Sequence, residues 1–548
     1  MAKVNGGQLV QKVFKKEGVK YIFGIPGGHI YPMMESCADN DIPFIGVRHE
    51  MNAAFMAEGW ALTTGEIGVC TGTAGPGFTN LVTGLANASC NKVPVLCMAG
   101  KARTSEYDRN ELQDFNQVPV VSDMCKHVRS VLDGNRIPEY IGRAINTAVN
   151  DVPGPVYIDI PREKMECGDY EEDEIEFQDN YVCKARPGGS PEAIAKAAQL
   201  INKAERPVVI AGSGAFFSGA AEVLTEFIEK TGMPIFTRNA GRGIVPDYHP
   251  LAMGIGASQH PVCAGAIQNA DLIVMLGTRT GYTLNRKVFP KGTNIVRVDI
   301  SAAALTDQLD VTAGIVGDVK TVLEQLMPAV EKKSHDEWVG MIKESLAGIA
   351  AFTASSMASD QKPVHPLRLV AEIAKRVDKD TIVVIDGGDT ASWGNTVIPA
   401  MGPGQLLTIA NGSFGPLGVG MPYAIAAKLA HPEKKVILLT GDGAFGYGAM
   451  ELDTCMRYGI KVDVVILNDA CWGMIKNSEA KKSTGKDKEF VGLYLRETHY
   501  EEVAKGLGAY GEFITDACDI GPAIDRAMAQ DLPSVVNVMT DVNIAYAF

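Results

Sequence analysis

Short runs of apolar residues, many of them β-branched, alternate with amphipathic segments along the whole chain. The runs are apolar at successive positions rather than at alternate ones, which is typical of strands buried on both faces of a parallel sheet. Apolar positions at helical spacing lie between them, as in 191–204 and 365–377. We predict an α/β fold of three doubly wound domains, each with a mainly parallel sheet. The strands are predicted at 93–100, 154–161, 207–212, 271–277, 294–300, 381–388, 435–441, 462–468 and 533–539.

Two polar stretches interrupt this rhythm. Residues 167–191 are acidic and then rich in Pro and Gly, and residues 357–366 are polar and contain two prolines. Both compositions are typical of linkers. They predict three domains, at 1–170, 190–335 and 360–548.

The charge of the chain argues against a nucleic-acid or membrane partner. The sequence has 51 Lys and Arg against 65 Asp and Glu, a formal net charge of −14, whereas phosphate backbones and anionic lipids attract clustered positive charge. The 11 cysteines include no CxxC pair, the N-terminus has no signal-peptide layout, and no window approaches the ~18 apolar residues of a membrane span. We therefore expect a cytoplasmic protein that acts on small molecules.

Polar residues directly follow two of the predicted strands. Asp442 comes between two glycines after one strand, and Asn468 and Asp469 end the next. Since ligands bind beyond the carboxyl ends of parallel strands, neighbouring strands would bring these oxygen atoms together in a site suited to Mg²⁺. The amides of Gly443 and Ala444, at the start of the next helix, would face a diphosphate. Either motif alone is also compatible with a simple turn.

The sequence GDG, followed by about two dozen residues and an Asn, resembles the diphosphate and metal motif of thiamine diphosphate enzymes. The family pattern ends in Asn-Asn, and Asp469 stands at the second of these positions. The resemblance implies that Asp442, Asp469 and the backbone carbonyl of Cys471 hold Mg²⁺. Asn468 is the alternative ligand to Asp469.

Three further segments carry the resemblance. VRHEMNAAFMAEGWA (47–61) is similar to the segment that supplies the Glu at the cofactor's aminopyrimidine ring, which is Glu50 here. A buried carboxylate there promotes the imino tautomer that removes the thiazolium proton. TGTAGPGFTNLVTGLANA (71–88) and NGSFGPLGVGMPYAIAAKLA (411–430) resemble family turns and helices, and Leu417 stands where an apolar residue bends the cofactor. The resemblance assigns the cofactor to Glu50, Leu417, Gly441, Gly443, Ala444, Asn468, Gly415 and Thr390.

Substrate choice depends on the residues expected above the thiazolium ring. His29, in FGIPGGHIYPM (23–33), resembles the proton-transferring His of benzaldehyde lyases, and Gln113 matches the Gln that binds the substrate oxygen in lyases and synthases. An amide suits that task because it donates a hydrogen bond without titrating. The resemblance predicts a carbon–carbon lyase and carboligase for 2-hydroxy ketones and aldehydes, with Glu50, His29 and Gln113 as catalytic residues. Asn411 departs from this pattern, because benzaldehyde lyases have a second His there.

Three alternatives stay open. A 2-hydroxyacyl-CoA lyase or an oxalyl-CoA decarboxylase-like enzyme would need positive charge around the nucleotide, for which KKSTGKDK (481–488) is the local source. Acetolactate synthases have a small residue in place of His29. A non-catalytic cofactor-binding homologue is the third alternative, and the intact Glu50 argues against it.

The central segment IAGSGAFFSGAAEV (210–223) resembles a dinucleotide-binding turn, because glycines follow a strand and open a helix. Its spacing is GxGxxxxG, Phe217 occupies the place of the third Gly, and TRNAGRG stands where an acidic ribose ligand is expected. We expect a Rossmann-like scaffold without FAD.

The resemblance also implies an assembly. In this family the Glu at the position of Glu50 reaches the diphosphate domain of a neighbouring subunit, so a monomer would lack a complete site. We therefore expect a homodimer at least, and a homotetramer as a dimer of dimers, that acts on a small-molecule carbonyl substrate with thiamine diphosphate and Mg²⁺.

Overall fold

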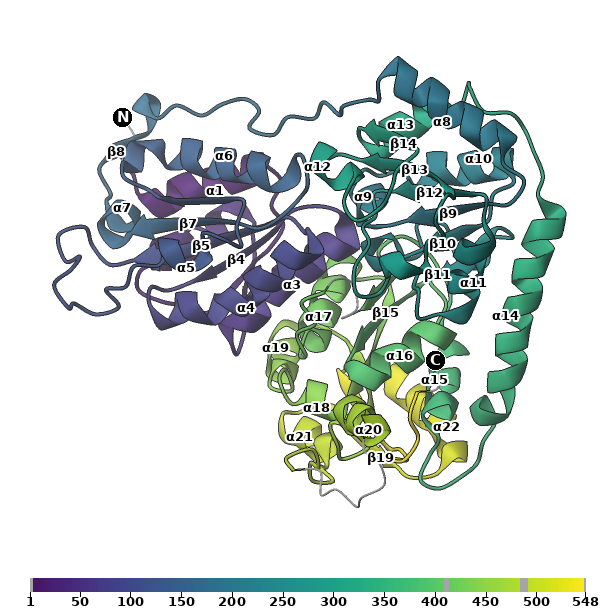
Figure 1. Cartoon of the computed structure of the whole chain (residues 1–548). Helices are drawn as coiled ribbons and strands as arrows, with labels where there is room; N and C mark the ends of the chain where they lie inside the picture. Colours follow the sequence, from purple (N-terminus) through teal and green to yellow (C-terminus); the bar gives the residue numbers. More distant parts are fainter. Residues whose placement is uncertain (1–2, 409–412, 483–490, 547–548) are drawn as a thin grey trace. The chain divides into compact units, whose positions relative to one another are not determined.

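Three six-stranded parallel sheets form the framework of the chain (Figure 1). The computed structural model describes residues 3–408, 413–482 and 491–546. The α/β class predicted from the sequence is confirmed. Contacts divide the chain into two compact units, of which the first contains Met1–Ala185, Phe414–Ala430 and Met450–Ile460 and the second contains the remainder. The predicted boundaries of three domains stay predictions.

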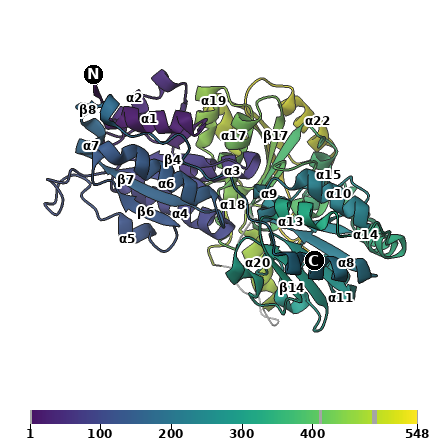
Figure 2. The same ribbon diagram turned by 90° about the horizontal axis from the view of Figure 1, so that it is seen from above.

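The N-terminal sheet lies in the first unit and has the strand order β3-β2-β4-β5-β7-β6. Helices α1 and α6 pack on one of its faces, and α3 and α4 contact the sheet from the other, as Figure 1 shows from the side; Figure 2 gives the same ribbon from above. The strands are β2 (Ile22–Gly24), β3 (Phe44–Gly46), β4 (Gly68–Gly72), β5 (Val95–Lys101), β6 (His127–Ser130) and β7 (Val156–Pro161), beside a short antiparallel pair, β1 (Lys3–Val4) and β8 (Tyr170–Glu171). The helices are α1 (Gly6–Lys16), α2 (Tyr31–Glu35), α3 (Glu50–Thr64), α4 (Pro76–Asn91), α5 (Val118–Val121), α6 (Ile137–Val149) and α7 (Arg162–Glu166).

The central sheet lies in the second unit and has the strand order β11-β10-β9-β12-β13-β14. Its strands are β9 (Pro207–Ala211), β10 (Ile235–Thr237), β11 (Ala252–Ile255), β12 (Leu272–Leu276), β13 (Asn294–Asp299) and β14 (Ala313–Val316). Its helices are α8 (Pro191–Lys203), α9 (Ser213–Phe217), α10 (Ala221–Thr231), α11 (Pro261–Asn269), α12 (Ala302–Leu305), α13 (Val319–Leu326) and the long α14 (Asp336–Met357).

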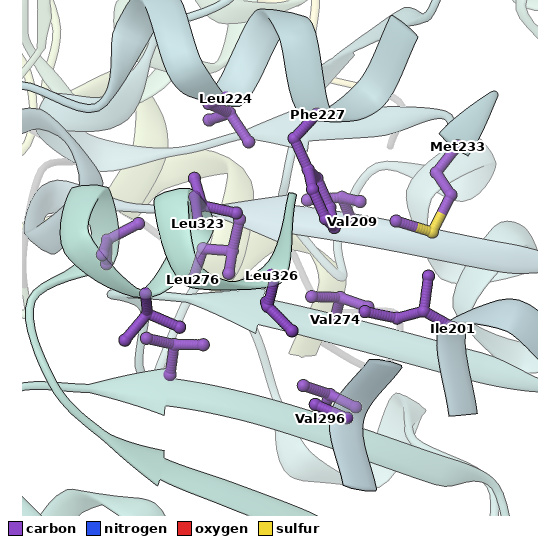
Figure 3. Close-up of a cluster of buried hydrophobic side chains, with 14 of the residues drawn as sticks. Ile201, Val209, Leu224, Phe227, Met233, Val274, Leu276, Val296, Leu323 and Leu326 are labelled. Atoms are coloured by element: carbon purple, nitrogen blue, oxygen red, sulfur yellow. The ribbon is translucent and has the colours of Figure 1, made fainter. Parts of the chain in front are cut away.

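Alternate residues of these central strands face two separate cores. Val209 and Val274 pack with residues of α8, α10 and α13 (Figure 3). Their chain neighbours Val208 and Ile273 point the other way, into a core closed by α11 and α14. Burial on both faces explains why the strand sequences are apolar at every position.

The C-terminal sheet also lies in the second unit and has the strand order β16-β15-β17-β18-β20-β19. Its strands are β15 (Thr381–Asp386), β16 (Leu406–Thr408), β17 (Lys435–Gly441), β18 (Asp463–Asn468), β19 (Tyr510–Ile514) and β20 (Ser534–Met539). Its helices are α15 (Pro366–Ala374), α16 (Gly388–Val397), α18 (Asp442–Phe445), α20 (Gly473–Lys482), α21 (Tyr500–Gly506) and α22 (Ala517–Met528). Two helices from the same stretch of sequence, α17 (Gly420–Ala430) and α19 (Glu451–Tyr458), pack instead in the first unit.

Each of the nine strands predicted from apolar runs is a strand in the structure. Most of the strands that the sequence did not reveal are short or polar. For example, β2 and β10 have three residues each, and β6 contains His127, Arg129 and Ser130. Such segments do not form the apolar run on which the prediction depends.

A buried acid, Glu58, lies on α3 inside the first unit. Its two carboxyl oxygens accept hydrogen bonds from the side-chain amides of Asn87, at 2.7 Å, and Asn91, at 2.7 Å. Burial raises the pKa of Glu58 from 4.5 to about 7, and the hydrogen bonds from Asn91, Asn87 and Tyr423 oppose that shift. The folded chain therefore holds the proton of Glu58 more tightly than the unfolded chain does.

This difference predicts a loss of stability with rising pH. The contribution of the Glu58 proton is complete below the unfolded pKa of 4.5 and disappears as the pH rises through about 7. It amounts to up to about 3 kcal/mol. Glu58→Gln, which resembles the neutral acid, should flatten this part of the dependence of unfolding free energy on pH, measured by urea denaturation between about pH 5 and pH 8. The same change at exposed Glu66 is the control and should leave the slope as in the parent.

Candidate active site

Glu50 begins α3 at the end of a short loop that follows β3. His49 caps the helix, since its Nδ1 accepts the Met51 amide at 3.1 Å. The Glu50 side chain is 8% exposed, and its Oε2 accepts a hydrogen bond from the amide of Asn80 on α4 at 2.9 Å. A Cβ on Gly77 would lie 3.5 Å from Oε1, so this oxygen faces bare backbone.

His29 and Gln113 lie on one hydrogen-bonded chain that runs through Thr73. The His29 Nδ1 is 3.0 Å from Thr73 Oγ1, and the Thr73 hydroxyl is 3.4 Å from Gln113 Oε1. If the hydroxyl donates to Gln113, it accepts from His29 Nδ1, which leaves the lone pair of His29 on Nε2. Burial, and to a lesser degree the charge of Arg162, lowers the pKa of His29. A neutral imidazole with a free lone pair is a proton acceptor.

Close packing of glycine fixes both ends of this chain. A Cβ on Gly100, in β5, would lie 2.2 Å from the His29 Cβ, so only glycine leaves room for the histidine. Gly75 has a φ of +63°, and a Cβ there would lie 3.1 Å from the Cβ of Gln113. Gln113 itself has a φ of +63°, an uncommon conformation for a residue with a side chain.

Gln117 is a buried residue of this site that the sequence did not reveal. Its Oε1 accepts the amide of Gly75 at 2.9 Å, and its Nε2 donates to the Gly100 carbonyl at 3.0 Å and to the Tyr157 hydroxyl at 2.7 Å. Gln117 therefore links the turn at Gly75, which packs against Gln113, to strand β5, whose Gly100 packs against His29. Its only sequence signal is its place four residues after Gln113.

The predicted metal ligands lie at the ends of neighbouring strands of the second unit. Strands β17 and β18 pair in parallel, with Gly441 beside Leu467, so Asp442 and Asp469 leave the sheet at the same edge. Asp442 is 3% exposed, and its Oδ2 has no hydrogen-bond partner among the described residues. Burial and then the charge of Asp469 raise the pKa of Asp442 to about 7.

The pKa of Asp469 is raised as well. Burial raises its pKa to about 6, and nearby Asp389 adds to the effect. Its Oδ1 accepts the Cys471 amide at 3.1 Å, through a turn in which Ala470 has a φ of +52°. A buried carboxylate beside a partly buried one requires a cation if both are to be charged. A divalent ion fits this donor set.

Asn468 is engaged elsewhere. Its Oδ1 accepts the Ala470 amide at 3.1 Å, and its Nδ2 donates to Asn537 Oδ1 at 3.0 Å and to the Thr498 carbonyl at 3.2 Å. These bonds occupy both ends of the side-chain amide. The geometry therefore favours Asp469 over Asn468 as a metal ligand, while the carbonyl of Cys471 stays a prediction.

Glycine backbone next to the carboxylates is closely approached by neighbouring side chains. Gly387, with a φ of +112°, and Gly441 approach each other, and a Cβ on either would lie 3.1 Å from the Thr390 side chain. A Cβ on Gly443 would lie 2.6 Å from the Trp472 ring. The predicted roles of Thr390, Gly441, Gly443 and Ala444 are compatible with this geometry and stay predictions.

The remaining predicted residues belong to the first unit or lie outside the described residues. Leu417 is half-buried, and Gly415 is exposed with a φ of +67°. Asn411 lies outside the described residues, as does most of the basic run 481–488. The cofactor roles of Leu417 and Gly415 stay predictions.

The glycines of the central segment have a packing role. Gly214 donates its amide to the Gly277 carbonyl at 2.9 Å, and a Cβ on Gly214 would lie 2.7 Å from the Gly277 Cα. Close contact between two backbones accounts for glycine here without a dinucleotide. The expectation that FAD is not bound stays a prediction.

Comparison with known proteins identifies the family. Models of thiamine pyrophosphate (that is, diphosphate) enzymes match the chain in three places: the N-terminal TPP binding domain at residues 4–120, the central domain at 194–326 and the C-terminal TPP binding domain at 386–538. A "Probable acetolactate synthase" of Mycobacterium bovis is 32% identical over 99% of this chain and 97% of its own length. The chain belongs to the thiamine pyrophosphate enzymes.

Other relatives of this thiamine pyrophosphate enzyme carry the names of two kinds of enzyme in the superfamily. A "Probable acetolactate synthase large subunit" of Methanocaldococcus jannaschii is 32% identical over 98% of the chain and 92% of its own length. A "2-hydroxyacyl-CoA lyase 2" of Caenorhabditis elegans is 30% identical over 96% of the chain and 88% of its own length. These names favour the two predicted alternatives, and they give the more specific resemblance to benzaldehyde lyases no support.

The residues of this thiamine pyrophosphate enzyme fit the cofactor that the family implies. The buried unpaired oxygen of Asp442 and the bare glycines suit a magnesium diphosphate. Among the described residues, no group of three or more His, Cys, Asp or Glu side chains could hold a metal alone, as expected when Mg²⁺ takes its other ligands from phosphate and water. In the described part of the chain, every helix is too short or too polar to cross a bilayer.

Asp442→Ala should abolish the Mg²⁺-dependent part of cofactor binding, since it removes the unpaired buried oxygen. In the parent, thiamine diphosphate with Mg²⁺ should raise the melting temperature, because a ligand that binds the folded state stabilises it. The variant should lose this rise in a thermal-shift titration. An equal rise in both proteins would contradict a metal role for Asp442.

Asp469→Ala and Asn468→Ala should have opposite effects. Without Asp469 the apoprotein should melt at or above the parent temperature, because a like charge beside Asp442 is gone, but Mg²⁺ should no longer stabilise it. Without Asn468 the apoprotein should lose roughly 1–3 kcal/mol, because Asn537 loses a buried partner. Isothermal titration with Mg²⁺ and thiamine diphosphate, together with melting of the apoproteins, separates the two.

Proposed function

We propose that this thiamine pyrophosphate enzyme breaks and forms the bond between a carbonyl carbon and a hydroxyl-bearing carbon, in a 2-hydroxyacyl thioester or a 2-hydroxy ketone. The observation that carries the proposal is the buried His29, hydrogen-bonded through Thr73 to Gln113. The relative named as a 2-hydroxyacyl-CoA lyase supports it.

The chemistry is divided between cofactor and protein. When bound, thiamine diphosphate supplies a nucleophilic carbon that adds to carbonyl groups. Glu50, held by Asn80, is the partner of the cofactor's pyrimidine ring, and Asp442 and Asp469 hold its diphosphate through Mg²⁺. These residues bind and orient the cofactor but do not select a substrate.

His29 and Gln113 act on the substrate. Cleavage beside a hydroxyl-bearing carbon releases an aldehyde only if the hydroxyl proton leaves, and the lowered pKa of His29 keeps its imidazole neutral and able to accept that proton. In the ligation direction the same imidazole returns the proton. The Nε2 amide of Gln113, whose Oε1 is taken by Thr73, is left to donate to the substrate oxygen.

Acetolactate synthesis is the second candidate, because relatives from Mycobacterium bovis and Methanocaldococcus jannaschii carry that name at 32% identity. Decarboxylation of a 2-oxo acid requires no removal of a hydroxyl proton, so His29 would serve only the ligation step. The two candidates therefore differ in the step that needs His29.

The working unit is proposed to be at least a homodimer, and a homotetramer as a dimer of dimers. Glu50 and Asp442 belong to different compact units. The family resemblance supports a site completed by Glu50 of a neighbouring subunit.

A substrate screen tests the proposal. The purified protein with thiamine diphosphate and Mg²⁺ is offered a 2-hydroxyacyl-CoA, benzoin, acetoin and pyruvate, and aldehyde release and acetolactate formation are followed. Aldehyde from the thioester or a ketone supports the lyase. Acetolactate from pyruvate without aldehyde from the others supports the synthase, and no turnover of any compound together with no cofactor binding contradicts both.

His29→Ala should lower the rate of aldehyde release by about 10²–10⁴-fold, the usual contribution of a general base, while cofactor affinity stays as in the parent. Because the pKa of His29 is below its ordinary value of 6.5, the acid limb of the parent profile of kcat/KM against pH should lie below 6.5 and be missing in the variant. His127→Ala, on strand β6 of the N-terminal sheet, is the control and should keep that limb. An equal loss of melting temperature and rate in the two variants would mean that His29 is structural.

A further inference from the structure

A second buried acid, Glu451, is hydrogen-bonded to the loop that leads to Glu50 and to the first turn of α3. Glu451 begins α19, which packs in the first unit, and its side chain is fully buried. Its Oε1 accepts two hydrogen bonds, from the backbone amide of Arg48 at 3.0 Å and from the side-chain amide of Asn52 at 2.7 Å. These two donors stand on either side of Glu50 in the sequence, so one oxygen atom fixes both flanks of that residue.

The rest of α19 strengthens the same contact. Tyr458 accepts the amide of Gly46 at 2.8 Å through its hydroxyl, and Arg457 donates to the Gly46 carbonyl at 2.5 Å. Gly46 is the last residue of β3, where the loop to Glu50 begins. One helix from a distant part of the sequence therefore binds the connection from β3 to α3 at both of its ends.

The Glu451 carboxylate has a complete set of donors. Its Oε2 accepts the hydroxyl of Thr454 at 2.6 Å, in addition to the two bonds to Oε1. A buried carboxylate is costly unless it is hydrogen-bonded, and removing it leaves its donors unpaired. Between β3 and α3 the backbone is also fixed by the Val47 amide, which donates to the Gly24 carbonyl at 3.0 Å, and by the His49 cap. The salt bridge between Arg48 and Asp453, at 3.6 Å and half-exposed, adds little.

We infer that Glu451 is a positioning residue for Glu50: by binding Arg48 and Asn52 it sets the backbone from which the Glu50 carboxylate reaches the pyrimidine ring. The inference rests on the proposed function, in which Glu50 activates the cofactor. A misplacement of such a group by ~1 Å is enough to lower a rate by about 100-fold.

The test compares Glu451→Ala, Glu451→Gln and Cys455→Ala. The Gln variant keeps an oxygen for Arg48 and Asn52, while Thr454 can accept from its amide group. Cys455→Ala removes a buried side chain from the same helix without touching the loop, and so reproduces a general loosening of α19. Glu50→Gln is the reference for loss of the activating carboxylate.

Two measurements are made. In the apoprotein, hydrogen–deuterium exchange of the peptide that covers residues 46–52 should quicken in Glu451→Ala and stay at the parent rate in Glu451→Gln and Cys455→Ala. With saturating thiamine diphosphate and Mg²⁺, kcat should fall about 10- to 100-fold in Glu451→Ala, with KM changed much less, and should be near the parent value in Glu451→Gln.

The outcomes separate the two hypotheses. If Glu50→Gln leaves turnover unchanged, the proposed function is wrong whatever Glu451 does. If Glu50→Gln is inactive but Glu451→Ala exchanges and turns over like Cys455→Ala, the positioning role is wrong and the proposed function stands. Equal loss of kcat in the Ala and Gln variants also contradicts positioning, because the Gln variant preserves the bonds to the loop.

Discussion

Burial of the parallel strands on both faces is the constraint from which the site follows. Strands such as β9 and β12 send alternate residues into two apolar cores. A charged group within such a strand needs a partner, as Asp159 on β7 has in Lys101 at 3.6 Å. The residues predicted to carry the chemistry accordingly lie beyond the ends of the strands. His29 follows β2, and Asp442 and Asp469 follow β17 and β18.

Three buried carboxyl groups show how differently the fold treats a charge. Glu451 accepts three hydrogen bonds from the protein. Two of the donors, Arg48 and Asn52, lie on either side of Glu50 in the sequence. Glu58 receives amide donors in a fully buried place, and burial still raises its pKa to about 7. Asp442 has an oxygen with no donor among the described residues and another carboxylate beside it. Of the three, only Asp442 has a carboxylate oxygen without a hydrogen-bond partner among the described residues, which is the property expected of a metal ligand.

The sequence predicted the fold because long apolar runs are local signals. It did not predict β2, β3 or β10, which are three residues long and depend on their neighbours in the sheet. Asp442, Asp469 and Glu50 could be predicted as site residues because each stands at a recognisable place in a motif. The assignment of the metal ligand became sharper only when the bonds of Asn468 to Asn537 and Thr498 were known.

The residues that position the site residues could not be predicted from the sequence, for a physical reason. Thr73 lies in the Gly-rich segment 71–88, but the contacts that it makes with His29 and Gln113 bring three separate loops together. Gln117 and Glu451 are ordinary polar residues until the fold buries them against backbone groups. Substrate identity is out of reach for the same reason, because it depends on side chains gathered from several loops. The expected likeness to benzaldehyde lyases depended mainly on His29, since the Gln113 pattern is shared by lyases and synthases. Whole-chain similarity points to other members of the superfamily.

The position of α19 has a consequence for an assembly. A short stretch of backbone joins Asp442, the predicted metal ligand, to Glu451, which is hydrogen-bonded on both sides of Glu50. If a chain keeps its metal ligand for its own cofactor and lends Glu50 to its neighbour, these two residues of one polypeptide belong to different reaction centres. Binding of magnesium diphosphate at Asp442 in one centre would then affect the backbone that leads to Glu451, and through it the position of Glu50 in the other centre. Such an enzyme would not behave as independent halves, and its saturation by cofactor would be cooperative.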